Sequence, residues 1–176
     1  ISNNNIIIDS KSGYSGAGRG VHKKYKNQNL YESLRAYGLA LHRHNSEIQQ
    51  ELDLFSKKIN NFQFTPHLTP MFRGILSTIY IDLRKGVTKN KVNSELKKYY
   101  KSERFVKISN PDTFLSTNDV INTNNCIISV CNSKYKSKLI ILSVIDNLIK
   151  GGSGQAVQNM NIRCNFNENE GLNGKI

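Results

Sequence analysis

Residues 36–52 read AYGLALHRHNSEIQQEL, a stretch that changes from an apolar beginning to a helical end. Its first part is apolar enough for a buried strand or for an extended segment that leads to the helix. The second part, from Asn45 onward, predicts an amphipathic helix. Its apolar residues Ile48, Leu52 and Phe55 recur at helical spacing. We therefore expect the fold to be organised around a strand-to-helix transition in this stretch.

Four ionisable side chains lie where this helix is expected to begin: His42, Arg43, His44 and Glu47. Two imidazoles and a carboxylate can move protons, and a helix N-terminus with a guanidinium beside it can hold an anion. The same residues also fit a polar helix N-terminus that carries two surface histidines. The spacing alone leaves both interpretations open.

A glycine-rich segment precedes this stretch. Asn5–Asp9 (NIIID) predicts a short strand, and Ser10–Gly20 (SKSGYSGAGRG) predicts an irregular loop. Such a loop exposes backbone N–H groups and hydroxyls, which suits a phosphate or a carboxylate, although a flexible surface loop fits it equally well. It lacks the Gly-Lys-Ser/Thr of a P-loop and does not match GxGxxG. Val21–Arg35 predicts irregular chain with a short helical piece near Leu30–Leu34.

The rest of the chain predicts strands and helices joined mainly by hairpins. Two strands that flank the turn at Pro66–Pro70 should form an antiparallel pair, and His67 between them fits a structural or surface histidine. A polar, loose tail is expected from Asn165 onward. The expected strands are Asn61–Leu68, Phe72–Leu83, Phe105–Ile108, Asn124–Val130 and Leu139–Ile145, and the expected helices, besides one that ends near Lys58, are Thr88–Ser102 and Gln155–Cys164.

About six strands and three helices, with hairpin rather than βαβ connections, predict the α+β class. We expect a mainly antiparallel or mixed sheet with helices on one face. A length of 176 residues without a visible internal boundary predicts one domain over residues 1–176. No apolar run approaches the roughly 20 residues of a membrane span. Ile1 in place of Met, without a signal peptide, predicts a fragment or a processed chain.

The net charge of +12 raises the expectation of an anionic partner. The lysines are scattered, however, along a chain that is also rich in Asn and Ile. No recognition motif or aromatic platform interleaved with Lys and Arg accompanies them. A basic nucleic-acid-binding module is therefore an alternative and not the main prediction.

The three cysteines, Cys126, Cys131 and Cys164, are odd in number and lack the pairing of a metal site. None has a neighbouring His or a glycine turn that would mark it as an activated nucleophile. We expect buried thiols in a reducing cytoplasm, and no metal.

Four motifs occur along the chain in this order: SKSGYSGAGRG, AYGLALHRHNSEIQQEL, FTPHLTPMFRGILST and DNLIKGGSGQAVQNMN. Together they resemble the C-terminal half of the N-acetyl-gamma-glutamyl-phosphate reductase family, arginine-biosynthesis enzymes related to aspartate-semialdehyde dehydrogenase. The resemblance covers Ile6 to about Leu172. It implies a C-terminal domain like that of glyceraldehyde-3-phosphate dehydrogenase. It also implies NADPH-dependent reduction of N-acetyl-gamma-glutamyl phosphate to the semialdehyde, through a thioester on a cysteine.

The resemblance also implies that part of the enzyme lies outside this chain. In the family, the nucleophilic cysteine and the dinucleotide-binding domain lie upstream, and neither motif occurs here. We therefore expect a substrate-binding and oligomerisation half that is inactive alone. Its N-terminal half would be supplied in cis or as a separate chain, and would bind most of the NADP(H). A cytoplasmic homo-oligomer acting on a small acyl phosphate, without nucleic acid or membrane, is expected.

Site residues follow from the resemblance where its motifs match. His42 and His44 match the His-Arg-His that contains the acid/base partner of the cysteine, and the sequence does not decide between them. Ser46 stands where the family usually has proline, and a serine can cap a helix there. The expected substrate-binding residues are Arg19, Arg43, Glu47 and Arg73, and the expected cofactor-binding residues are Ser12, Gly13, Ser15, Gly16 and Gln155, with Gly151, Gly152 and Gly154 allowing close backbone approach.

The sequence leaves two further functions and two further interpretations of the site open. A sister reductase could act on a related acyl phosphate, such as an aminoadipyl or aspartyl one. The chain could also be a dimerisation domain that has lost its catalytic half. For Arg19 and Arg73, ordinary surface or helix-capping roles compete with anion binding, and a glycine-rich turn explains the segment before Gln155 equally well.

Overall fold

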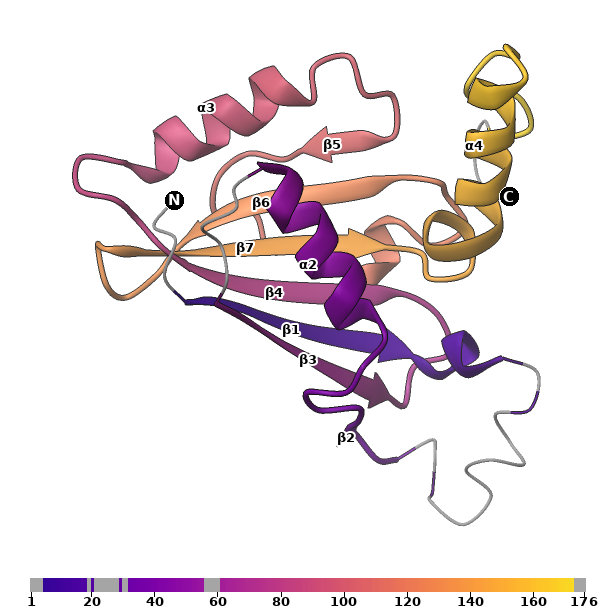
Figure 1. The fold of residues 1–176 in the computed structure, drawn as a ribbon, viewed down its shortest axis with the longest axis horizontal. Helices are drawn as coiled ribbons and strands as arrows, with labels where there is room; N and C mark the ends of the chain where they lie inside the picture. The colour runs from indigo at the N-terminus through magenta and orange to yellow at the C-terminus, as the bar shows by residue number, and fades with distance from the viewer. Residues whose placement is uncertain (1–4, 19, 21–28, 30–31, 56–60, 173–176) are drawn as a thin grey trace.

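The computed structural model of the chain describes residues 5–18, 20, 29, 32–55 and 61–172 (Figure 1). Within them the strands form one seven-stranded sheet in the order β2-β3-β1-β4-β7-β6-β5. The strands are β1 (Ile6–Gly13), β2 (Arg35–Ala36), β3 (Phe62–Thr69), β4 (Ile75–Asp82), β5 (Val106–Ile108), β6 (Cys126–Asn132) and β7 (Lys138–Ile145). The helices are α2 (His44–Phe55), α3 (Lys89–Tyr99) and α4 (Gly154–Arg163), with short turns η1 (Tyr14–Ala17), η2 (Thr117–Asp119) and η3 (Ile149–Ser153).

The sheet is mixed, which confirms the predicted fold class. β1 runs parallel to β3 and antiparallel to β4, and β5 runs parallel to β6. The predicted antiparallel pair of strands 61–68 and 72–83 is wrong, because β1 lies between them. Ile8 pairs with Phe64 on one side and with Ile79 on the other, so the apolar run of β1 is covered from both edges. The path from β1 through α2 to β3 is a parallel crossover, not a hairpin.

β1 is longer than the sequence predicts. The segment assigned to an irregular loop continues the strand to Gly13, because Ser10 and Ser12 pair with β3 and β4 at once. Ser10 is buried, and its hydroxyl lies 2.7 Å from the Ser77 hydroxyl. Two neighbouring strands thus override the low strand propensity of the serines. Gly13 is required by packing, since a Cβ there would lie 2.6 Å from the Phe72 carbonyl oxygen.

The helices α2 and α3 lie on one face of the sheet, as predicted (Figure 1). Leu52 of α2 and Val92 and Leu96 of α3 pack against the core formed by Ile6, Ile81, Val130 and Leu139. α3 begins where its Thr88 cap predicts, and the Thr88 hydroxyl accepts the Lys91 N–H. α4 does not cover this face; it follows β7 at the end of the sheet.

The opposite face of the sheet is open over its β1 and β4 region. Ile7 pairs with Tyr80, which in turn pairs with Ile140 of β7. Ile7 and Tyr80 keep 44% and 42% of their surface exposed. Toward β6 the same face is covered, because the Cys131 thiol donates to the Thr113 carbonyl. An apolar strip therefore remains at the surface of the described chain.

His67 lies within β3, not in the turn where the sequence places it. Its Nδ1 is 3.3 Å from Asp9 Oδ1 of the neighbouring β1, and the Lys11 ammonium also contacts that carboxylate. This contact agrees with the predicted structural role of His67.

Two other sequence predictions are wrong in the described residues. The apolar run before His42 is not a buried strand, since β2 ends at Ala36 and Leu41 is 90% exposed. A turn with positive φ at Gly38 and Ala40 occupies this position. The tail after Asn165 is not loose, because its residues are anchored by buried amides of α4. Asn161 donates to the carbonyls of Glu168 and Glu170, and Leu172 is buried.

Some predictions lie outside the described residues. Two of the five residues of the expected helical piece at 30–34 lie there, whereas residues 32–34 are described and form a turn and irregular chain, not a helix. The predicted helix end near Lys58 also lies outside the described residues. The remaining predicted strands and helices are confirmed, with ends that shift by a few residues.

Candidate functional site

The candidate residues gather at one end of the sheet. β1, β3 and β7 run in the same direction, so the segments that follow them lie at the same edge (Figure 1). These segments are η1, residues 70–74 and η3. The turn before α2 joins this edge through β2, since Ala36 pairs with His67 and the Tyr37 N–H donates to Pro66. Tyr37 also packs against Tyr14 and Leu68.

His42 is held in a defined orientation among aromatic rings. Its ring centroid lies 5.3 Å from that of Tyr37, 5.4 Å from Phe64 and 4.6 Å from His44. Its Nδ1 accepts the backbone N–H of His44 at 3.2 Å. An accepting Nδ1 leaves the proton of the neutral ring on Nε2. His42 is therefore arranged to donate from Nε2.

Burial lowers the pKa of His42, and the neighbouring His44 and Arg43 lower it further, while Glu47 opposes them. We expect the NMR signals of the His42 ring to titrate with a midpoint below the ordinary histidine value of 6.5. The His42→Gln variant identifies the signals by their loss. A midpoint at or above 6.5 would contradict the described environment of the ring.

His44 differs from His42 because it is the first residue of α2 and its side chain is about half exposed. Its Nε2 lies 3.8 Å from Glu47 Oε2, one turn further along the helix. Arg43 is exposed beside it. The Ser46 hydroxyl donates to the Arg43 carbonyl. A capping serine would instead accept a backbone N–H, so Ser46 stabilises this turn as a hydrogen-bond donor. The turn thus presents an accessible imidazole, a guanidinium and a carboxylate together.

The predicted cofactor loop follows β1, and Tyr14 in this loop packs against Tyr37 of the turn before α2. Ser12 and Gly13 end β1, and Ser15 and Gly16 belong to η1. The loop is fastened to residues 71–74 by three backbone bonds, among them Gly13 N–H to Gly74 and Ser15 N–H to Phe72. Arg19, which the sequence assigns to the substrate, lies outside the described residues.

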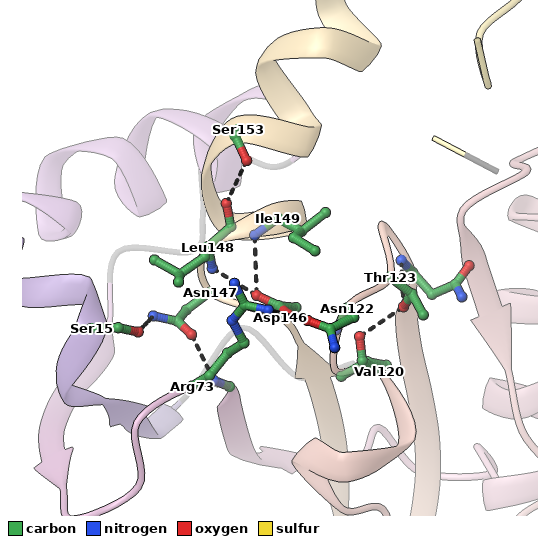
Figure 2. Close-up of polar contacts among 12 residues, drawn as sticks. Ser15, Arg73, Val120, Asn122, Thr123, Asp146, Asn147, Leu148, Ile149 and Ser153 are labelled. Carbon is green, nitrogen blue, oxygen red and sulfur yellow. Dashed lines mark hydrogen bonds and ion pairs between the residues drawn. The ribbon is translucent and has the colours of Figure 1, made fainter. Parts of the chain in front are cut away.

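Arg73 already has partners within the protein (Figure 2). Its guanidinium donates to the Asn122 side chain and lies 3.6 Å from Asp146 Oδ2. Its side chain keeps only 26% exposure. The predicted role of Arg73 in binding substrate remains a prediction, and the structure gives it a further role beside Asp146.

Asp146 and Asn147 are residues that the sequence analysis missed, although they lie in the quoted motif DNLIKGGSGQAVQNMN. Asp146 is 0% exposed, and its carboxylate accepts the N–H groups of Asn122, Leu148 and Ile149 at 2.8–3.1 Å (Figure 2). It therefore fixes the turn η3. An Asp-Asn pair between a β-branched strand and a glycine-rich turn is the signal that could have identified them.

Gln155 lies in the first turn of α4, where its amide donates to Asn159. Gly154 before it is required by packing, because a Cβ would lie 2.4 Å from Asn124 Oδ1 and 2.5 Å from Ile149 Cγ2. Gly151 and Gly152, in contrast, are exposed in η3. These two glycines leave the backbone of η3 exposed at this end of the sheet.

The cysteines fit the sequence prediction only in part. Cys131 is buried and Cys126 half-buried, but Cys164 is exposed after α4, so the prediction of three buried thiols is wrong. Burial raises the pKa of the Cys126 thiol, which keeps it protonated. Over the described part of the chain, no group of three His, Cys, Asp or Glu residues could hold a metal ion. Nor does any helix there reach the length and hydrophobicity that crossing a membrane requires.

Comparisons with known proteins test the resemblance stated from the four motifs. The family model described as semialdehyde dehydrogenase, dimerisation domain, matches residues 1–147. An N-acetyl-gamma-glutamyl-phosphate reductase of Desulforamulus reducens is 46% identical over 167 residues, which are 95% of this chain and 48% of the relative. A probable chloroplastic N-acetyl-gamma-glutamyl-phosphate reductase of Arabidopsis thaliana is 43% identical over 98% of this chain and 43% of the relative. The chain spans about half the length of these relatives.

Solved structures show the same fold. Aspartate semialdehyde dehydrogenase II from Vibrio cholerae superposes with a TM-score of 0.64 at 16% identity, over 93% of this chain and 56% of that chain. A probable aspartate-semialdehyde dehydrogenase from Pseudomonas aeruginosa gives a TM-score of 0.62 at 12% identity, over 82% and 50%. The resemblance stated from the four motifs is thus confirmed, and the chain belongs to the semialdehyde dehydrogenase family, whose dimerisation domain matches residues 1–147.

Proposed function

We propose that residues 1–176 are the substrate-binding and oligomerisation half of an NADPH-dependent N-acetyl-gamma-glutamyl-phosphate reductase. The observation that carries the proposal is the turn before α2, which holds His42 and His44 against Phe64 of β3 and packs Tyr37 against Tyr14, at the start of the glycine-rich loop of Ser15 and Gly16. Proton-handling groups and a backbone-lined ligand site are what reduction of an acyl phosphate requires. Relatives of this name at 42–47% identity support the choice of substrate.

The two imidazoles take different roles in this proposal. His42 carries its proton on Nε2 and donates a hydrogen bond to the oxygen on which negative charge develops. His44 is more accessible and its Nε2 lies 3.8 Å from the Glu47 carboxylate, and in this proposal it exchanges protons with the reacting groups. Arg43 attracts the anionic substrate to the same turn. The attacking cysteine comes from the half of the enzyme outside this chain.

NADP(H) supplies the hydride in such a reaction. The residues present fit this cofactor, because Gly16, Gly151 and Gly152 are exposed. Without side chains, they let the cofactor approach the backbone closely. Ser15, Gly16 and Gln155 would hold its nicotinamide side, together with Ser12 and Gly13. The rest of the cofactor would bind to the other half of the enzyme.

The exposed apolar side chains of α4 and of the turn that follows it are the surface that we assign to that other half. Met160 and Ile162 on α4, and Phe166 just after it, are exposed. The family model of the dimerisation domain ends at residue 147, whereas the matches to the relatives continue across α4. Contact with the dinucleotide-binding half, in cis or as a separate chain, would cover these apolar side chains.

Self-association is assigned to the open face of the sheet. Ile7, Tyr80 and Ile140 form an apolar row there, and exposed apolar strips of this kind favour burial against a second copy. The description of the matching family model as a dimerisation domain supports a homo-oligomer.

Tyr80→Arg should weaken self-association of this chain by about 100-fold or more. A two-fold interface would bury the new charge twice, and a single central residue can contribute about 2 kcal/mol or more. Sedimentation velocity over a dilution series measures the change. Tyr135→Arg, at an exposed position on the β6–β7 turn, is the matched control and should leave the dimer intact. An unchanged dimer in Tyr80→Arg would exclude this face.

The proposed function is tested by restoring the missing half. We expect no NADP⁺ reduction by the chain alone with N-acetylglutamate semialdehyde and phosphate. Joined to the N-terminal half of the Desulforamulus reducens relative, the chain should support the reaction. The relative cut and rejoined at the same boundary is the control for assembly. A chimera that sediments like this control but shows no activity would contradict the proposal.

A further inference from the structure

Asn147 joins three segments that are far apart in the sequence. It follows β7, is only 7% exposed, and its side chain points to the start of β4 and to η1 (Figure 2). Its Oδ1 accepts the Gly74 N–H at 2.6 Å, and its Nδ2 donates to the Ser15 hydroxyl at 2.9 Å. A single buried amide thus connects positions 73 and 132 residues away along the chain.

The orientation of this amide follows from its partners. The Gly74 N–H can only donate, so it requires the oxygen of Asn147, and the amide nitrogen must then face Ser15. A flipped amide would place two donors against each other. A carboxylate would face Ser15 without an N–H, and an apolar side chain would satisfy neither partner. Asn147 therefore fits both contacts with one fixed geometry.

Three exposed glycines surround Asn147. A Cβ on Gly16 would lie 3.4 Å from Asn147 Nδ2, one on Gly151 would lie 3.9 Å from its Cβ, and one on Gly152 would lie 3.5 Å from its carbonyl oxygen. The two glycine-rich segments, η1 and η3, thus meet at this residue. The backbone of Asn147 is itself fixed, because the preceding Asp146 carboxylate accepts two N–H groups of η3.

We propose that Asn147 is a positioning residue that locks the Ser15–Gly16 loop and the Gly151–Gly152 turn into one rigid ligand-binding edge. Asn147 acts through these segments rather than by contacting the reacting atoms. The identity of the ligand, the nicotinamide side of NADP(H), rests on the proposed function. The locking itself rests only on the two hydrogen bonds and the glycine contacts.

The locking is tested in the chain itself by amide hydrogen exchange. Asn147→Leu removes both hydrogen bonds at similar volume, so the amides of Ser15 and Gly74 should exchange about tenfold faster or more. Asn161→Leu is the matched control, because Asn161 is also a buried amide with two hydrogen bonds, and both go to the carbonyls of Glu168 and Glu170, outside this edge. In the control, these amides should keep their protection. Equal protection in Asn147→Leu and the parent, or equal loss in both variants, would overturn the proposal.

Kinetics of the chimera described above separate positioning from general stability. Asn147→Leu should raise the KM for NADP⁺ about tenfold while kcat changes less than about threefold, since the loop is displaced but the histidines are not. Ser15→Ala should add almost nothing in the Asn147→Leu background. Unchanged KM in Asn147→Leu, or additive effects of the two changes, would overturn the role at the ligand. An inactive parent chimera would reject the proposed function, and hydrogen exchange would still decide the locking.

Discussion

His44→Ala in the assembled reductase should lower kcat by about 10²–10⁴-fold, the usual contribution of a positioned proton-transfer group. His44 is the imidazole that is accessible and has a carboxylate nearby, whereas His42 uses Nδ1 to accept a backbone N–H. Steady-state kinetics of the chimera, with KM values for both substrates, measures the loss.

His42 supplies the comparison. His42→Gln keeps an N–H donor and should cost less than about tenfold, whereas His42→Ala should cost more than His42→Gln because the donor is absent. A larger loss in His42→Gln than in His44→Ala would reverse the assigned roles. Losses below about tenfold in both alanine variants would mean that neither histidine transfers a proton in this reaction.

Asp146→Ala should lower the free energy of unfolding by about 3–5 kcal/mol, because it leaves a partly buried Arg73 without its anion. It also removes the acceptor for the N–H groups of Leu148 and Ile149, which begin η3. Urea denaturation of the chain, followed by circular dichroism, measures the change.

The control for Asp146 is a capping carboxylate at the surface. Asp119→Ala breaks an exposed capping box with Ser116 and should cost only about 0.5–2 kcal/mol. Asp146→Asn keeps the shape and removes the charge, so it should fall between the two. A cost below about 1 kcal/mol for Asp146→Ala would show that the buried carboxylate does not hold this end of the sheet.

Elements whose signals are local could be predicted from the sequence. α3 has its Thr88 cap and an apolar face at Val92 and Leu96, and β7 is a run of β-branched and leucine residues. β1 could not be predicted in full, because Ser10 and Ser12 become strand only through pairing with β3 and β4. Those partners lie more than 50 residues away along the chain, and no local sequence pattern predicts the pairing.

The site was predictable to a similar extent. The motif resemblance selected His42 and His44 as candidates, and their site role stays a prediction. The structure packs both rings against Phe64 of β3, and Tyr37 of the same turn against Tyr14. The resemblance could not indicate that Asp146 and Asn147 hold this edge together. Their importance depends on burial and on partners such as Gly74 and Asn122, which only the fold brings close.

The substrate preference of the assembled enzyme tests the central claim most directly. We would measure kcat/KM for phosphate-dependent NADP⁺ reduction with N-acetylglutamate semialdehyde and with aspartate semialdehyde, using the same chimera. The proposed function predicts a preference for N-acetylglutamate semialdehyde of about 100-fold or more, since a site built to hydrogen-bond the acetamido group discriminates strongly against its absence. Equal use of the two, or a preference for aspartate semialdehyde, would contradict it.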